Sequence, residues 1–142
     1  MKLQVQSLPL LSGLTIRRCC EQKYLNDNKD VLMPGWHVPT TAEWDNLSAA
    51  VGGSRVAGTK LKSSNGWSSG NGTDDFGFTV FPAGYRESSN FGGLGNISCF
   101  WTSVNSSSTL AYLRRFSTGA GMGSENFDKI FAYSVRLVKD SV

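Results

Sequence analysis

Residues 35–47 read Gly35-Trp36-His37-Val38-Pro39-Thr40-Thr41-Ala42-Glu43-Trp44-Asp45-Asn46-Leu47, and this stretch decides the fold. Pro39 fixes its own φ and disfavours the helical conformation for Val38, so the chain must arrive here as a strand or a turn. Thr40 stands three residues before Glu43, which is the spacing of a capping box. In that arrangement each side chain satisfies a backbone donor at a helix N-terminus. The stretch therefore predicts a helix that begins just after Thr40.

The apolar residues that follow keep the spacing of this helix. They form one stripe, which consists of Trp44, Leu47 and Val51, and Gly52-Gly53 supplies a left-handed end. A second, shorter helix is predicted from a Ser54 cap to about Lys62, and Gly58 weakens it.

The rest of the chain alternates short apolar runs with segments rich in Gly, Ser and Asn. Period-two patterns predict strands over residues 76–80, 97–103, 110–116 and 131–139. Loops are expected over residues 63–75, pinned by one aromatic residue, Trp67, and over residues 83–96, 104–109 and 119–130.

Composition describes one globular domain, because 142 residues are enough for one hydrophobic core and too few for two ordinary domains. The formal net charge is +3, and no basic run is longer than a pair, so we expect no nucleic-acid partner. No apolar run is long enough to cross a bilayer, so we expect no membrane insertion. Three cysteines, two of them adjacent at Cys19-Cys20, provide no readable disulfide framework.

Four ordered motifs, at residues 35–47, 77–86, 100–103 and 134–140, resemble the Fibrobacter succinogenes major paralogous domain. That family is similar to the formylglycine-generating-enzyme branch of the C-type lectin-like fold, whose Arg-Leu-Pro-Thr-x-x-Glu-Trp element resembles residues 37–44. The resemblance implies an α+β fold of the C-type lectin-like kind, with two helices packed on twisted antiparallel strands with long loops. It would cover residues 31–142, after a poorly matched segment 1–30. It also implies that a strand over residues 8–16 pairs with the last strand.

The resemblance bears on the cysteines as well. Relatives often carry one Cys before the Gly-Trp-His motif and one in the last strand, where this chain has Leu32-Met33 and Leu137. The joint loss favours a reduced cytoplasm or a phage particle over secretion, and residues 8–16 lack a cleavage site for export. Formylglycine generation needs two cysteines late in the chain, and only Cys99 lies there, so we expect Cys99 to be a small buried apolar residue.

No catalytic or cofactor site is predicted. His37 is the single histidine, and Glu43 already serves the helix cap, so we expect His37 to be structural. No base is positioned to activate a Ser or Cys nucleophile. Oxygen-bearing side chains gather at Asn71, Thr73, Asp74 and Asp75, where calcium is an alternative to the turn-forming role that we favour. The expectation is a chain that is not an enzyme and holds no metal.

Apolar residues that stand out in a polar, loop-rich C-terminal region predict a contact surface. In the family pattern Tyr112, Arg114 and Phe116 match core positions, so Leu113 and Arg115 should point outward. The predicted ligand-binding residues are Trp101, Val104, Asn105, Leu110, Leu113, Arg115, Thr118, Glu125, Phe127, Ile130 and Phe131. Among them, the apolar anchors would be Leu113, Phe127 and Phe131, and Arg115 and Glu125 would discriminate between ligands.

Some proteins of this family resemble variable proteins of diversity-generating retroelements, in which mutagenesis diversifies a lectin-like binding face. This implies a non-enzymatic module, bacterial or phage-encoded, that binds a protein or cell-surface ligand. The scaffold residues would be Ala111, Tyr112, Arg114, Phe116, Ser134, Val135 and Arg136. An ordinary divergent paralogue without diversification stays open. So do a carbohydrate-binding cell-surface domain that stacks sugars on Trp67 or Trp101 and a purely structural appendage.

Overall fold

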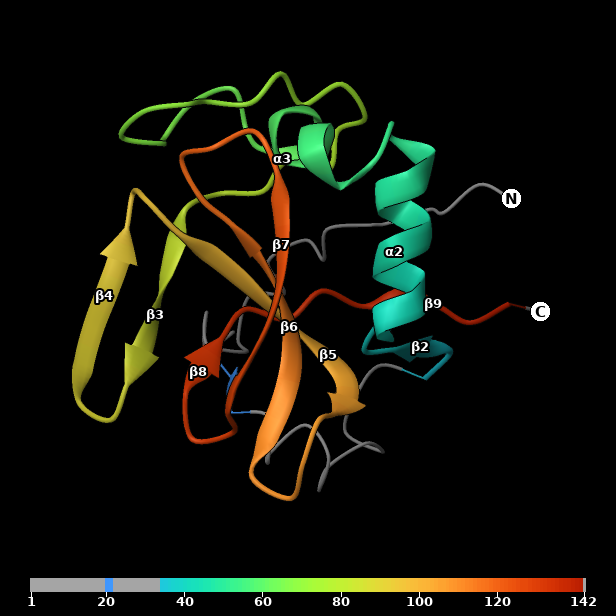
Figure 1. The fold of residues 1–142 in the computed structure, drawn as a ribbon, viewed down its shortest axis with the longest axis vertical. Coiled ribbons are helices and arrows are strands. Elements are labelled where there is room, and N and C mark those ends of the chain that lie inside the picture. The colour runs from blue at the N-terminus through green and yellow to red at the C-terminus, as the bar shows by residue number, and fades with distance from the viewer. Residues whose placement is uncertain (1–19, 22–33, 142) are drawn as a thin grey trace.

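A computed structural model describes residues 20–21 and 34–141 of the chain (Figure 1). These residues form an α+β fold with two helices, a curled seven-stranded mixed sheet and a separate two-stranded sheet. The large sheet has the strand order β1-β8-β3-β5-β6-β7, and β4 pairs with β3 outside this path. Figure 1 shows α2 and α3 on one side of β5–β7, and the β3–β4 hairpin on the other.

The first helix begins where the sequence predicts. Helix α2 spans Thr41–Ala50, and Thr40 is its N-cap. The Glu43 backbone N–H donates to Thr40 Oγ1 at 3.2 Å, and the Thr40 N–H donates to Glu43 Oε2 at 2.8 Å. The helix then ends before Gly52, whose φ of 108° is a conformation that glycine adopts without strain. The capping-box prediction is confirmed.

The second helix, α3, spans Ser54–Leu61, close to the predicted range, but Ser54 is not its cap. Gly53 occupies the N-cap position and makes no side-chain hydrogen bond. Gly58 has a packing reason to be glycine: a Cβ there would lie 2.3 Å from the carbonyl oxygen of Gly121. The helix backbone thus lies so close to the loop before β7 that only glycine fits at this position. Composition alone does not reveal this close approach.

The predicted strand over residues 76–80 is wrong, because a side chain holds this segment as a turn. Asp74 accepts hydrogen bonds from the Thr79 backbone N–H at 2.7 Å and from Thr79 Oγ1 at 2.6 Å. Thr79 and Gly77 both have positive φ, and Phe76 is 58% exposed. A carboxylate that captures nearby backbone donors competes with ladder hydrogen bonds.

Two predicted loops contain strands. Residues 83–96 form the hairpin of β3 (Ala83–Glu87) and β4 (Asn90–Leu94), and residues 119–130 contain β7 (Met122–Asp128). Strands β4 and β7 are rich in Gly, Ser and Asn, and pairing with a neighbouring strand overrides this weak β-propensity. For β7 that neighbour is β6, with continuous register from Leu110↔Asp128 to Phe116↔Met122.

The predicted central hairpin is confirmed as β5 (Ser98–Asn105) and β6 (Leu110–Phe116). The predicted closing strand over residues 131–139 is broken into β8 (Ala132–Tyr133) and β9 (Val138–Lys139). Strand β8 pairs with β1 (Cys20–Glu21) and β3, whereas β9 pairs with β2 (Trp36–His37). The predicted strand over residues 8–16 lies outside the described residues.

Side chains on the two faces of β5–β7 belong to two different hydrophobic cores. The first core lies under the helices and contains Trp44, Val51, Ala57, Leu61, Trp67, Phe78, Val80, Phe100, Phe116 and Met122. The second core lies on the opposite face and contains Cys99, Trp101, Ala111, Leu113 and Tyr133. Helix α2 is fixed over the first core by Arg114, which is 3% exposed and donates to Asp45 Oδ1 at 2.7 Å.

The loop over residues 63–75 is held by two buried side chains. Trp67 is 5% exposed and donates from Nε1 to the Val80 carbonyl, which confirms the predicted anchor. Lys62, at the C-cap of α3, is 1% exposed. Its Nζ donates to the carbonyl oxygens of Gly70, Ser117 and Gly119, so one ammonium ties this loop to the β6–β7 connection.

Candidate functional site

The face of β5–β7 that points away from the helices brings together five of the predicted ligand-binding residues. The register pairs Trp101 with Leu113 and Leu113 with Glu125. Partners across a ladder point to the same face, and so do residues two apart on one strand. The shared face therefore carries Trp101, Leu113, Arg115, Glu125 and Phe127.

The floor of this face is fully buried. Trp101 and Leu113 are both 0% exposed, so the expectation that Leu113 points outward to solvent is wrong. The physical reason is that the sheet curls and is covered on both faces. Tyr133 of β8 packs edge-to-face on Trp101, with ring centroids 4.9 Å apart, and closes the second core over Leu113.

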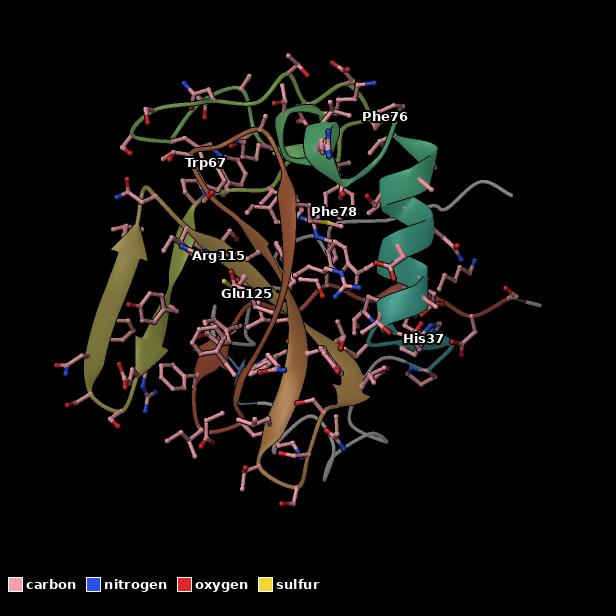
Figure 2. The ribbon with its side chains drawn as sticks, viewed as in Figure 1. His37, Trp67, Phe76, Phe78, Arg115 and Glu125 are labelled. Carbon is pink, nitrogen blue, oxygen red and sulfur yellow. The ribbon has the colours of Figure 1, made fainter. Side chains whose placement is uncertain are left out.

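Above the floor lies a partly exposed set of side chains, which we name the rim: Arg115, Glu125, Phe127, Ile130 and Phe131. Arg115 Nη1 donates to Glu125 Oε1 at 3.1 Å, and the two side chains are 39% and 35% exposed. Figure 2 shows them side by side, on the side of β6 and β7 toward the β3–β4 hairpin. The rim thus offers a donor and an acceptor at one point.

The apolar part of the rim comes from β7 and the turn into β8. Phe127 is 38% exposed and Ile130 is 62% exposed, whereas Phe131 packs against the second core. The rings of Phe127 and Phe131 meet edge-to-face at 5.8 Å, and Phe131 stacks parallel to Tyr133 at 5.9 Å. Rings fixed on one another in this way lose little freedom when they contact a ligand.

The other predicted site residues do not join the rim. Val104, Asn105 and Leu110 lie at the hairpin end of β5 and β6, and Thr118 lies beyond the opposite end of β6. The Thr118 backbone packs so closely on Gly70 that a Cβ at Gly70 would clash with it. Thr118 therefore contacts the 63–75 loop, which sequence spacing alone did not indicate.

Cys99 lies on the same face as the rim, as the register partner of Arg115. Its side chain is 4% exposed, which confirms the prediction of a buried cysteine. Burial raises the pKa of the Cys99 thiol to about 12, and the nearby Arg115 charge only partly opposes this. Burial likewise raises the pKa of Tyr133. Both groups are therefore uncharged at neutral pH.

The model of the Fibrobacter succinogenes major domain matches residues 21–139 of the chain. The chain belongs to the Fibrobacter succinogenes major domain family. The predicted family resemblance is thereby confirmed, while the boundary predicted near residue 31 stays a prediction. Comparisons with curated proteins and with solved structures gave no match.

The single histidine of this Fibrobacter major domain lies between two carboxylates. His37 Nε2 is 2.8 Å from Glu43 Oε1, and Nδ1 is 2.6 Å from Asp140 Oδ1. Glu43 thus serves the helix cap and His37 at once. Sequence reasoning missed Asp140, which lies 103 residues away, and no local pattern could have indicated it. In the described part of the domain, no three His, Cys, Asp or Glu side chains gather as metal ligands.

In the Fibrobacter major domain the side chains of the oxygen-rich loop, where calcium was an alternative, make hydrogen bonds to other residues of the protein. Asn71 Oδ1 accepts from the Trp67 backbone N–H, and Asp74 accepts twice from Thr79. Thr73 Oγ1 donates to the Thr59 carbonyl oxygen. These contacts are those of turn-forming residues.

The two tryptophans proposed to stack sugars are both buried in this domain. Trp67 is 5% exposed and Trp101 is 0% exposed, so neither ring presents a face to a ligand. The proposal of stacking on these two rings is therefore wrong. A separate finding concerns membranes: among residues 20–21 and 34–141, no helix is long and apolar enough to span a bilayer.

Proposed function

We propose that this domain is a non-enzymatic ligand-binding module whose rim contacts a protein or another cell-surface ligand. The observation that carries the proposal is the rim itself. A half-exposed ion pair between Arg115 and Glu125 lies on the same sheet face as the exposed ring of Phe127. Apolar anchors beside a polar pair are the composition of energetically important contact sites.

The buried floor supports this proposal. Trp101 and Leu113 are completely enclosed beneath the rim, and β5, β6 and β7 pair along most of their length. A surface carried by paired strands and a packed core is already ordered before it meets a ligand. Binding therefore loses little entropy to ordering the contact residues.

We further propose that the fold is C-type lectin-like and that the rim positions can be diversified. Three of the seven residues expected to be scaffold support this, since Ala111 and Phe116 are 0% exposed and Arg114 is 3% exposed. Rim residues between and after them reach solvent, so they can change without opening the core. A nearby reverse-transcriptase gene and an imperfect repeat of the codons for residues 100–140 would support diversification. A locus without both would refute it.

The binding proposal is tested with rim variants of the whole chain. Fluorescently labelled protein is applied to panels of bacterial cells, purified surface proteins and glycans. The variant Arg115→Ala/Phe127→Ala/Ile130→Ala removes three partly exposed side chains. We expect it to stay folded with a lowered melting temperature, because the Phe127 ring contacts are lost, and to lose at least about tenfold in affinity for any probe that the wild type binds.

A matched control changes exposed residues on the helix side, as Asp45→Ala/Asn46→Ala/Arg55→Ala. Asp45 belongs to the Arg114 ion pair, so a second control leaves it unchanged. Full binding by the rim variant, or equal loss in the controls, would place the contact surface elsewhere. A hit confined to the glycan panel would favour the alternative of a carbohydrate-binding domain, with Phe127 rather than a tryptophan as the stacking ring.

A further inference from the structure

The contacts of His37 define a second feature, separate from the rim. Both ring nitrogens lie within hydrogen-bond distance of a carboxylate oxygen, at 2.8 Å for Glu43 and 2.6 Å for Asp140. A carboxylate accepts hydrogen bonds and does not donate them when ionised. A neutral imidazole has only one N–H, whereas the imidazolium has two. The geometry therefore fits the protonated ring.

The three groups come from three parts of the fold. His37 is in β2, Glu43 is in the first turn of α2, and Asp140 follows β9. Strands β2 and β9 pair over only two residues each, and the Asp140 backbone N–H donates to the Gly35 carbonyl oxygen at 2.8 Å. Figure 2 places His37 beside the end of α2 that lies next to β2.

We propose that His37 is a proton-dependent clasp, which holds the C-terminal strand β9 and Asp140 against β2 and helix α2 when the ring is protonated and releases them when it is neutral. After loss of one proton, one ring nitrogen keeps a lone pair that faces a carboxylate oxygen. That contact is repulsive, so either Asp140 or Glu43 must move. Asp140 is the freer of the two, because Glu43 is also held by the Thr40 backbone N–H.

The two carboxylates beside the His37 ring both raise its pKa. Burial alone lowers the pKa of His37, but the hydrogen bonds and charges of Asp140 and Glu43 outweigh it and raise the pKa above 6.5. Burial raises the pKa of Glu43, while the Thr40 N–H and His37 outweigh this and lower it, so Glu43 is ionised. The only other charged side chain on β2 or β9 is Lys139, whose backbone pairs with Trp36.

The sign of the effect follows from the raised pKa of His37. The contribution of the clasp to stability is fully present below the unfolded pKa of about 6.5. It is lost as the pH rises through the higher folded pKa. The His37 side chain is 38% exposed, so the ring exchanges protons with solvent without unfolding of the domain.

The test uses the full chain, in which the single histidine gives one unambiguous imidazole signal in NMR spectra. We expect a His37 pKa above 6.5, and a lower value in Asp140→Asn. Hydrogen exchange of the Asp140 amide, corrected for intrinsic rates, should lose about tenfold in protection as the pH passes that pKa. The amides in the middle of α2 should show no such step.

Two variants separate the clasp from general instability. His37→Gln has no titrating ring, so protection of the Asp140 amide should be low and independent of pH. If His37→Gln fails to fold, Asp140→Asn replaces it, because it leaves the capping box intact. Lys139→Gln is the control and should keep the step. A His37 pKa at or below 6.5, or wild-type protection without a step at the His37 pKa, would overturn the proposal.

Discussion

Lys62 provides the sharpest test of how this domain is held together. Its Nζ donates to the carbonyl oxygens of Gly70 at 2.5 Å, Ser117 at 2.8 Å and Gly119 at 2.8 Å. It also lies 4.8 Å from the ring centroid of Trp67. The change Lys62→Met keeps an unbranched apolar stem and removes the donors, so three carbonyl groups lose this partner.

The size of the effect follows from two opposing contributions. Hydrogen bonds from a charged group contribute about 1.5–3 kcal/mol each, and the transfer of an ammonium out of water costs several kcal/mol. A carbonyl oxygen that loses its donor and gains no water costs about 1–3 kcal/mol. We therefore expect Lys62→Met to lower the free energy of unfolding by about 3 kcal/mol, which corresponds to a fall of about 10 °C in Tm for a domain of this size.

The measurement is urea unfolding at equilibrium, followed by circular dichroism and tryptophan fluorescence. The control Lys60→Met makes the same change two residues earlier, in α3, at a side chain that is not fully buried. We expect this control to stay within about 0.5 kcal/mol of the wild type. A loss below about 1 kcal/mol in Lys62→Met would mean that the ammonium merely compensates its own desolvation, and the reasoning would be refuted.

Two further predictions concern buried positions. Gly58→Ala should lower the free energy of unfolding by about 2 kcal/mol or more, because its Cβ would lie 2.3 Å from the Gly121 oxygen. This clash outweighs the gain in helix propensity. The control Gly119→Ala, whose Cβ meets nothing closer than 3.8 Å, should be nearly neutral in the same urea experiment. With Cys19 and Cys20 replaced by Ser, the Cys99 thiol should resist iodoacetamide at pH 8 and react only in denaturant, because its pKa is raised to about 12; complete native labelling within minutes would contradict its burial.

The parts of the fold that sequence reasoning predicted correctly have determinants close together in the chain. Thr40 and Glu43 are three residues apart, and each satisfies the other's backbone donor, so the start of α2 could be predicted from the sequence. The β5–β6 hairpin was readable for the same reason. Strand β7 was missed because its Gly, Ser and Asn residues carry no apolar alternation. It is a strand because β6 lies beside it.

The candidate site divides in the same way. Alternation along β6 put Leu113 and Arg115 on one face, and the register adds Glu125 and Phe127 to that face. Sequence reasoning could not show that this face is covered, since the cover comes from Tyr133 on a strand that pairs elsewhere. Burial of Leu113 is therefore a consequence of sheet curvature, which has no local signature.

The pairing of β2 with β9 has a consequence for how the domain can be joined to other proteins. Because the Asp140 N–H reaches the Gly35 oxygen, the continuous segment 34–141 begins and ends at adjacent points, while β1 adds a separate strand beside β8. A segment with adjacent ends can be inserted into a surface loop of another protein without stretching the host backbone.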